Sequence, residues 1–211
     1  MDIKDRIIDK AQELFFQRGI KDVSMDELAS SLGISKRTIY ENFKDKEDIL
    51  KVLLNKLIHE RNLLYDKYID ENSNIVDIFI ATIEIHRSFP IGNTKFIRDI
   101  YKYYPEIGDA MHEYARQNNK SFQSLLHQGV KDGYVRPDLN IPVTAFLAEE
   151  TNYTYIRAVF IKQPPFSFDE LLYTMMMNFV RGILTEKGLK IIDEYTKNKN
   201  DETNKKVKQD K

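Results

Sequence analysis

The chain has 211 residues and contains 0 cysteines, which excludes both a disulfide framework and a metal site built on thiolates. It also has no apolar run of about 18 residues, the length that a helix needs to cross a bilayer. The first residues, Met1 to Asp5, lack the apolar stretch of a signal peptide. We therefore expect a soluble, cytoplasmic protein with no membrane partner.

The sequence also lacks the patterns of common catalytic and cofactor sites, among them a glycine-rich phosphate loop and a nucleophile elbow. The run from His112 to Arg116 begins like a zinc-protease motif, but its second histidine is missing. The four histidines have no metal-ligand spacing among themselves; they are His59, His86, His112 and His127. We therefore expect neither an enzyme nor a bound metal or cofactor.

Residues 24–47 show the pattern of two short helices joined by a tight turn. Ser24 and Glu27 form a capping box, which predicts the start of the first helix. Gly33 ends this helix, because glycine adopts a positive φ at little cost. Ser35 then caps a second helix that runs to about Phe43. This arrangement is a helix-turn-helix.

Basic side chains stand at the predicted helix starts, where the helix macrodipole disfavours them. Lys36 and Arg37 lie in the first turn of the second short helix, and Lys46 starts the helix that follows. Such cations are tolerated where a phosphate backbone lies opposite. Polar side chains on the same short helix suit a major groove; they are Thr38, Tyr40 and Asn42. The alternative is that all of these are solvated ends of surface helices.

These residues resemble the signature of the tetracycline-repressor (TetR) family over about residues 3 to 60. The segments that match are Met25 to Ala29, Leu32 to Ser35, Thr38 to Tyr40 and Phe43 to Glu47. The sequence departs from the family at Arg37, where a small residue is usual, and at Asn42, where histidine is frequent. The resemblance implies an operator-binding regulator, and the two departures concern which DNA is read rather than the fold.

The charge balance limits how DNA could be bound. Lys and Arg number 32 against 33 Asp and Glu, a net charge of −1, and residues 1–50 alone carry a net charge of −2. A nonspecific DNA coat would be strongly basic. We therefore expect the positive charge to be concentrated on one face, around Lys36, Arg37, Lys44 and Lys46, and affinity to fall steeply with salt.

The periodicity of the whole chain predicts an all-α fold of about nine helices, with no strand or hairpin signal in the body. A helix from about Ile3 to Arg18 covers the helix-turn-helix and completes a three-helix DNA-binding headpiece, residues 1–47. A long helix from about Lys46 to Ile69 leads from the headpiece into the body, and we expect it to transmit movements between them. Residues 48–190 form a helical ligand-binding and dimerisation domain.

Further helices are predicted in the body, followed by a polar tail. They begin near Asn74 and then span about Thr94–Tyr104, Glu106–Val130, Asn140–Lys162 and Ser167–Glu186. Residues 191–211 are predicted to be a disordered tail, because the last sixteen residues have almost no apolar content. The tail either solubilises the protein or adds weak attraction to DNA.

The last two predicted helices are apolar on more than one face, which indicates burial on several sides. A partner subunit and a central position in one core are the two explanations. We favour a homodimer, because a single helix-turn-helix has too small an interface for tight specific binding, and two match a palindromic operator. In TetR-like proteins the last two helices pair in a four-helix bundle, which this pattern resembles.

The family resemblance implies an inducer cavity in the body, and aromatic residues are enriched there. Apolar cavities with few polar groups are the usual sites for small ligands. For each candidate residue the alternative, and the more common case, is a place in the ordinary core. The candidates are Phe79, Ile83, His86, Phe96, Ile100, Tyr103, Phe122, Leu126, Phe146, Glu149, Tyr153 and Arg157.

The sequence thus favours a homodimeric, sequence-specific transcriptional regulator, a repressor released by a small apolar or aromatic inducer. The predicted DNA-binding residues are Ser24, Ser35, Lys36, Arg37, Thr38, Tyr40, Asn42, Lys44 and Lys46. Among them Arg37 is predicted to read a base edge, and Ser24, Tyr40 and Lys46 to contact phosphate. Two rivals are a ligand-independent architectural or division-control protein with the same headpiece, and an enzyme that uses the aromatic body.

Overall fold

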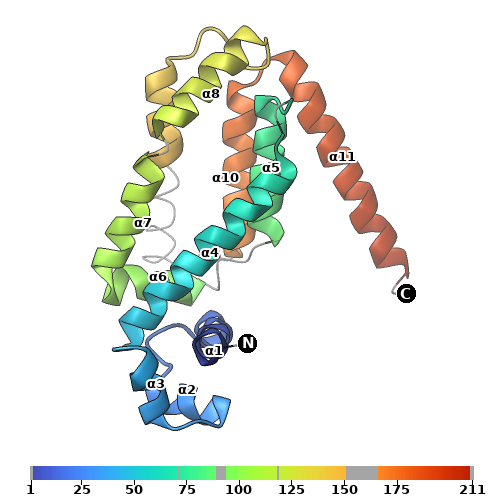
Figure 1. Ribbon diagram of the computed structural model, residues 1–211. Coiled ribbons are helices and arrows are strands. Elements are labelled where there is room, and N and C mark those ends of the chain that lie inside the picture. Colours follow the sequence, from blue (N-terminus) through green and yellow to red (C-terminus); the bar gives the residue numbers. More distant parts are fainter. Residues whose placement is uncertain (1, 71, 89–93, 118, 151–165, 210–211) are drawn as a thin grey trace.

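The computed structural model describes residues 2–70, 72–88, 94–117, 119–150 and 166–209. These residues are helical apart from turns and one isolated bridge between Val135 and Leu184. The headpiece of α1–α3 lies at one end, and α4 rises from it into a body of helices (Figure 1). The predicted all-α fold with an N-terminal helix-turn-helix is therefore confirmed. In the described residues no helix has both the length and the apolar character needed to span a membrane.

The headpiece and the long helix follow the predicted boundaries closely. The headpiece contains α1 (Ile3–Arg18), α2 (Met25–Leu32) and α3 (Lys36–Asn42), and α4 spans Lys46–Tyr68. Ser24 and Ser35 cap α2 and α3 by accepting hydrogen bonds from backbone N–H groups two to three residues into each helix. Gly33 ends α2 in the left-handed conformation, with φ of 65°, as the turn requires.

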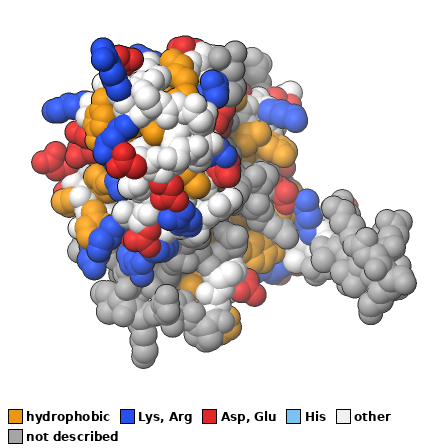
Figure 2. All heavy atoms as spheres, turned by 90° about the horizontal axis from the view of Figure 1, so that it is seen from below, with side chains coloured by type: hydrophobic (Ala, Val, Ile, Leu, Met, Phe, Trp, Pro, Cys, Tyr) orange, Lys and Arg blue, Asp and Glu red, His pale blue; other side chains and the backbone are white. Residues whose placement is uncertain are grey.

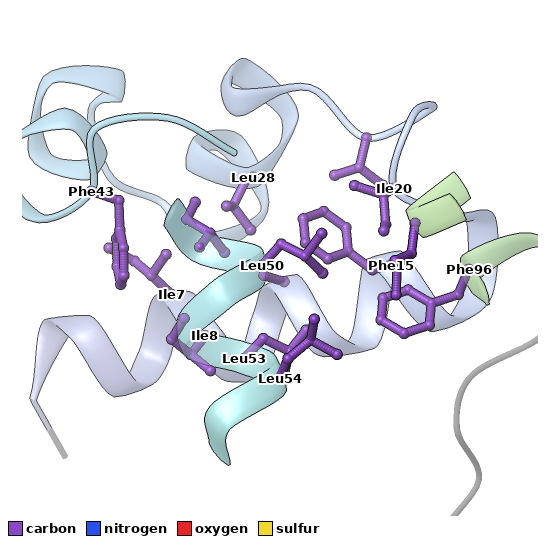
Figure 3. Close-up of a cluster of buried hydrophobic side chains, with 14 of the residues drawn as sticks. Ile7, Ile8, Phe15, Ile20, Leu28, Phe43, Leu50, Leu53, Leu54 and Phe96 are labelled. Carbon is purple, nitrogen blue, oxygen red and sulfur yellow. The ribbon is translucent and has the colours of Figure 1, made fainter. Parts of the chain in front are cut away.

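A hydrophobic core joins the headpiece to helices of the body. Side chains from α1, α2, α3 and the first half of α4 meet in it, and Phe15 of α1 is fully buried (Figure 3). Phe96 and Ile100 of α6 (Thr94–Tyr103) enter the same core and are also fully buried. Phe96 packs edge-on against Phe16, with ring centroids 4.9 Å apart. The headpiece is therefore packed on α6 as well as on α4.

A second core holds the far end of the body together. It is formed mainly by α5 (Ile75–Ser88), α8 (Asn119–Lys131), α10 (Phe168–Ile183) and α11 (Glu186–Gln209). Residues 141–150 are helical and contribute Ile141 and Ala145 to it. The capping box predicted at the start of α10 is present between Ser167 and Glu170. The two cores lie at opposite ends of α4, which links them (Figure 1).

Two predictions about the body reach residues that the structure does not describe. The segment predicted as one helix from Glu106 to Val130 is described as α7 (Pro105–Gln117) and α8, and residue 118 between them lies outside the described residues. Pro105 opens α7, a position that proline favours because its missing N–H is not needed there. The end of the helix predicted to reach Lys162 lies outside the described residues.

The predicted disordered tail, residues 191–211, is instead largely part of α11, which is helical to Gln209. Ile192 is fully buried in the second core, and the Tyr195 hydroxyl donates a hydrogen bond to Glu84 of α5. Lys199 pairs with the same carboxylate at 3.1 Å. These contacts fix the first turns, and a helix that is already started extends at little further cost. Low apolar content was therefore a poor guide here, since a few apolar side chains anchor the helix.

We predict that Ile192→Ala lowers the free energy of unfolding by about 2–5 kcal/mol, the usual cost of truncating a fully buried isoleucine. Lys190→Ala is the matched control, because Lys190 is exposed on the same helix, and we expect a change within about 0.5 kcal/mol. Urea unfolding followed by circular dichroism measures both. Equal, small effects would show that α11 does not belong to the core.

Candidate functional site

The face that the headpiece turns outward is formed by α2 and α3. Figure 2 views the molecule from this end and shows Lys and Arg side chains interspersed with Asp and Glu. Lys36 pairs with Asp26 at 2.7 Å, and Arg37 donates from Nε to Glu41 at 2.9 Å. The predicted concentration of positive charge is thus not a continuous basic patch, because neighbouring carboxylates partner the cations of α3.

These ion pairs are easily exchanged for contacts with another anion. The Arg37 side chain is 88% exposed, and exposed pairs contribute little because water screens them. The Asp26 carboxylate raises the pKa of Lys36 by accepting its hydrogen bond, so Lys36 stays charged. Lys36 and Arg37 can therefore exchange their weak ion pairs for contacts with a phosphate or with the edge of a guanine base that approaches α3.

The remaining predicted residues of α3 divide into exposed and structural ones. Tyr40 is 48% exposed, so its ring can reach a partner. Thr38 shares a hydrogen bond of 2.9 Å with Ser35, and the Asn42 amide donates to the Thr38 carbonyl at 2.8 Å. Ser35 and Asn42 therefore help to shape α3. Ser24 has the same kind of role at the start of α2, where its hydroxyl accepts from the Glu27 N–H.

Lys46 has a different position from the one predicted. Its ammonium donates to the carbonyls of Ile20 and Val23, each at 2.7 Å, and more weakly to that of Lys21 at 3.3 Å. Burial lowers the pKa of Lys46, whereas the nearby Asp99 and Asp22 act in the opposite direction. All three donor positions of the ammonium are occupied by the loop between α1 and α2. Lys46 is therefore a structural clamp on that loop and is poorly placed for phosphate.

The same loop is held from the body by α6. Asp99 is 2% exposed, and its Oδ2 accepts a hydrogen bond from the Lys21 N–H at 2.9 Å. Lys95 forms an ion pair with Asp22. Gly19, with φ of 85°, allows this approach, because a Cβ at that position would meet Asp99 at 2.7 Å. The loop is thus bound on one side by α4 and on the other by α6.

The body contains a cavity of about 1180 Å³ beside the second half of α4. Cavities of a few hundred to about 1,000 Å³ hold most small ligands, so this one accommodates a large molecule. Its wall is mainly apolar and includes the aromatic group of Phe79, Phe122 and Phe179, whose neighbouring centroids are 6.3 and 6.4 Å apart. Other described lining residues come from α4, α5, α7, α8, the 141–150 helix and α10.

The predicted ligand-binding residues fall into several groups. Phe79, Phe122 and Glu149 line the cavity. Ile83 and Leu126 are buried in the second core, and Phe96 and Ile100 in the headpiece core instead. Tyr103 is 39% exposed with its ring 5.0 Å from Lys21 Nζ, and Phe146 is 56% exposed, so neither faces the cavity. Tyr153 and Arg157 lie outside the described residues.

His86 lies beside the cavity region rather than on its described wall. Burial, together with the charge of Arg61, lowers the pKa of His86 to about 4, so the ring is neutral near pH 7. Sequence reasoning missed Arg61, Tyr65 and Thr82, which do line the cavity. The spacing of Arg61 and Tyr65, one turn apart on α4, is the signal that could have found them.

One group of possible metal ligands also lies near the cavity. His112 of α7, Glu149 and Glu150 place one ligand atom each within 4.8 Å of one another. The His112 Nε2 and the Glu150 Oε1 are 4.0 Å apart. All three side chains are partly exposed, and such acidic groups are common without a metal. The cluster alone does not identify a metal site.

Comparison with known proteins agrees with this geometry. The family model described as "Bacterial regulatory proteins, tetR family" matches residues 7–53, which contain the helix-turn-helix. Residues 7–53 therefore correspond to the DNA-binding domain of that family. The chain is 24% identical over 164 residues to the HTH-type transcriptional repressor KstR2 of Mycolicibacterium smegmatis, covering 73% of this chain and 78% of that one.

Two further relatives cover more of the chain. It is 24% identical to the uncharacterized HTH-type transcriptional regulator YhgD of Bacillus subtilis, over 87% of this chain and 97% of that one. A TetR-family transcriptional regulator from Marinobacter aquaeolei has the same fold, with a TM-score of 0.64 and 15% identity over 92% of this chain and 99% of that one. The protein is therefore a DNA-binding transcriptional regulator.

We predict that Arg37→Ala lowers discrimination between the operator and a scrambled duplex, because an arginine on a base edge contributes about 1–3 kcal/mol of specificity. Lys44→Ala should weaken both duplexes by similar factors, since an exposed lysine beside α3 is placed for a phosphate. Fluorescence anisotropy with both duplexes measures the two variants. Equal losses on both duplexes for Arg37→Ala would contradict its predicted role.

Proposed function

We propose that the protein is a homodimeric repressor, which binds a palindromic operator and is released by a small ligand with an apolar or aromatic body. One observation supports this most strongly. Helix α4 contributes Ile49, Leu50 and Leu53 to the headpiece core, and Ile58 and Tyr65 to the cavity wall. A ligand that moves the second half of α4 therefore acts on the helix that supports α3.

The headpiece is also attached to the body through α6, so α4 does not move it alone. The loop between α1 and α2 is bound by Lys46 of α4 and by Asp99 of α6. A change in the angle between α4 and α6 therefore moves the headpiece as a unit. In a dimer such a movement changes the distance between the two α3 helices, and half-sites about 34 Å apart no longer fit. Ligand binding thus shifts the population toward a conformer with low affinity for DNA.

Exposed apolar side chains support the dimer. Val143, Phe146 and Leu147 are between 49% and 56% exposed and lie at positions i, i+3 and i+4 of the 141–150 helix. Together they form one apolar stripe, which a partner subunit would cover. The sequence predicted dimerisation through two helices, and the stripe lies on the first of them. The second is α10, which α11 follows in the chain.

The division-control alternative is less well supported. It requires the same headpiece but no inducer, and a tightly packed body would favour it. The cavity of about 1180 Å³ and its aromatic wall favour a ligand instead. The enzyme alternative has no support from the relatives named above, which are transcriptional regulators.

The test is binding to duplexes that carry palindromes from the DNA flanking the gene, with sedimentation to count the chains for each site. We expect two chains for each palindrome, loss of affinity when one half-site is scrambled, and a steep fall in affinity between 50 and 200 mM salt, of about 10³-fold or more if six or more phosphates are contacted. A protein that stays monomeric at micromolar concentration and ignores every duplex at low salt would contradict the proposal.

A further inference from the structure

Arg61 is the most unusual polar residue of the cavity wall. It lies on α4 and lines the cavity, yet its Nε is buried and has no hydrogen-bond partner. The guanidinium makes no hydrogen bond or ion pair with any described residue. Arg61 as a whole is only partly buried, but its Nε–H is buried, and a buried donor without a partner is costly and rare unless something else satisfies it.

The neighbouring groups do not supply the missing partner. His86 feels the charge of Arg61 and is neutral near pH 7, so it adds no second cation. The Tyr65 hydroxyl donates to Thr82 Oγ1 at 3.2 Å, and Thr82 in turn donates to the Ile78 carbonyl at 2.8 Å. The donors of this part of the wall are therefore used within the protein. The Nε–H of Arg61 is left without a partner beside a mainly apolar wall.

Two carboxylates, Asp66 and Glu149, also line the cavity, and either could in principle neutralise Arg61. Asp66 is exposed, and among the described residues no ion pair joins Arg61 to either carboxylate. Asp66 follows Arg61 by five residues on α4, a spacing that does not bring two side chains together. A ligand anion that binds Arg61 therefore does not have to displace a carboxylate of the protein.

Building on the proposed function, we infer that the ligand is an amphipathic carboxylate, whose anionic group binds the Arg61 guanidinium and whose apolar body fills the cavity. The planar fork of arginine matches a carboxylate with two parallel hydrogen bonds. The body of the ligand packs against Phe79, Phe122 and Phe179, and against the flexible Met175 and Met176. Because Arg61 lies on α4, the anion binds directly to the helix that links the cavity to the headpiece.

The experiment compares ligands that differ in charge but share one body. Titration calorimetry without DNA measures the binding of dodecanoate against dodecan-1-ol, and of naphthalene-2-carboxylate against 2-naphthylmethanol. The proteins are the wild type, Arg61→Gln, Arg61→Lys and Lys67→Gln. Lys67 is the matched control, since it is an exposed cation on the same helix and does not line the cavity.

We expect at least one carboxylate to bind the wild type more tightly than its alcohol. Arg61→Gln should weaken that carboxylate by about tenfold or more, because a hydrogen-bonded charge pair is lost, and leave the alcohol nearly unchanged. Arg61→Lys should restore part of the affinity, whereas Lys67→Gln should have no effect. Equal losses for acid and alcohol, or tighter binding of both alcohols by the wild type, would overturn the inference, as would the absence of binding by all four probes.

A second measurement needs no ligand. If Arg61 has no partner in the unliganded protein, Arg61→Met should raise the melting temperature by about 2–4 °C, since a partly buried guanidinium with an unsatisfied Nε–H is replaced by an apolar side chain. An unchanged or lower melting temperature would show that Arg61 is satisfied within the protein. Release of the protein from operator DNA is measured separately. A carboxylate that binds through Arg61 but does not release the DNA would contradict the proposed function, and it would leave the inferred class of ligand intact.

Discussion

The contact on which the rest of the structure depends is the binding of the α1–α2 loop from two sides. Lys46 of α4 donates to three carbonyls of this loop, and Asp99 of α6 accepts from the N–H of Lys21. Asp99 is almost fully buried, and leaving a buried polar group without its partner costs about 1–3 kcal/mol. The loop therefore fixes the headpiece to α4 and α6 together. Without it, α6 would be joined to the headpiece mainly through its apolar side chains, among them Phe96 against Phe16.

The two halves of α4 have different surroundings and therefore different roles. The first half is buried among α1, α2 and α3, whereas the second half forms a wall of the cavity. Binding at one site can affect a distant site when the packed elements between them have two discrete arrangements, and binding at either site favours one of the two. In the proposed mechanism these elements are α4 and α6, and the packing of Phe96 against Phe16 makes a gradual deformation of the junction costly. The tetR-family match of residues 7–53, the junction and the cavity support the proposed account, in which a ligand in the body acts on DNA binding at the headpiece.

Local signals predicted the headpiece well, and long-range contacts explain what they missed. The capping residues Ser24 and Ser35 and the glycine at position 33 act on their own turns, so the sequence alone placed α2 and α3 correctly. Lys46 lies at the start of a helix, where the macrodipole disfavours a cation, and this position was interpreted as a sign of a phosphate contact. Its partners are carbonyls more than twenty residues away, which no local pattern reveals.

The body shows the same limit. Phe96 and Ile100 have the apolar character of cavity residues, but the direction of α6 turns them into the headpiece core. Arg61 was missed for the opposite reason, since an arginine on a long helix has the pattern of an exposed residue. Its significance comes from a buried atom without a partner, and only packing shows that. Periodicity thus identified the helices and their faces, but not which of two cores each face would enter.

The most direct test of this account is hydrogen–deuterium exchange in Lys46→Met, with Lys51→Met, an exposed lysine on the same helix, as the control. Removal of the ammonium leaves three carbonyls without their donor, so we predict faster exchange both in the α1–α2 loop and across α6, with the control unchanged. If exchange rises in the loop alone, or in neither segment, then α6 is not held to the headpiece through Lys46 and Asp99, and the central claim is wrong.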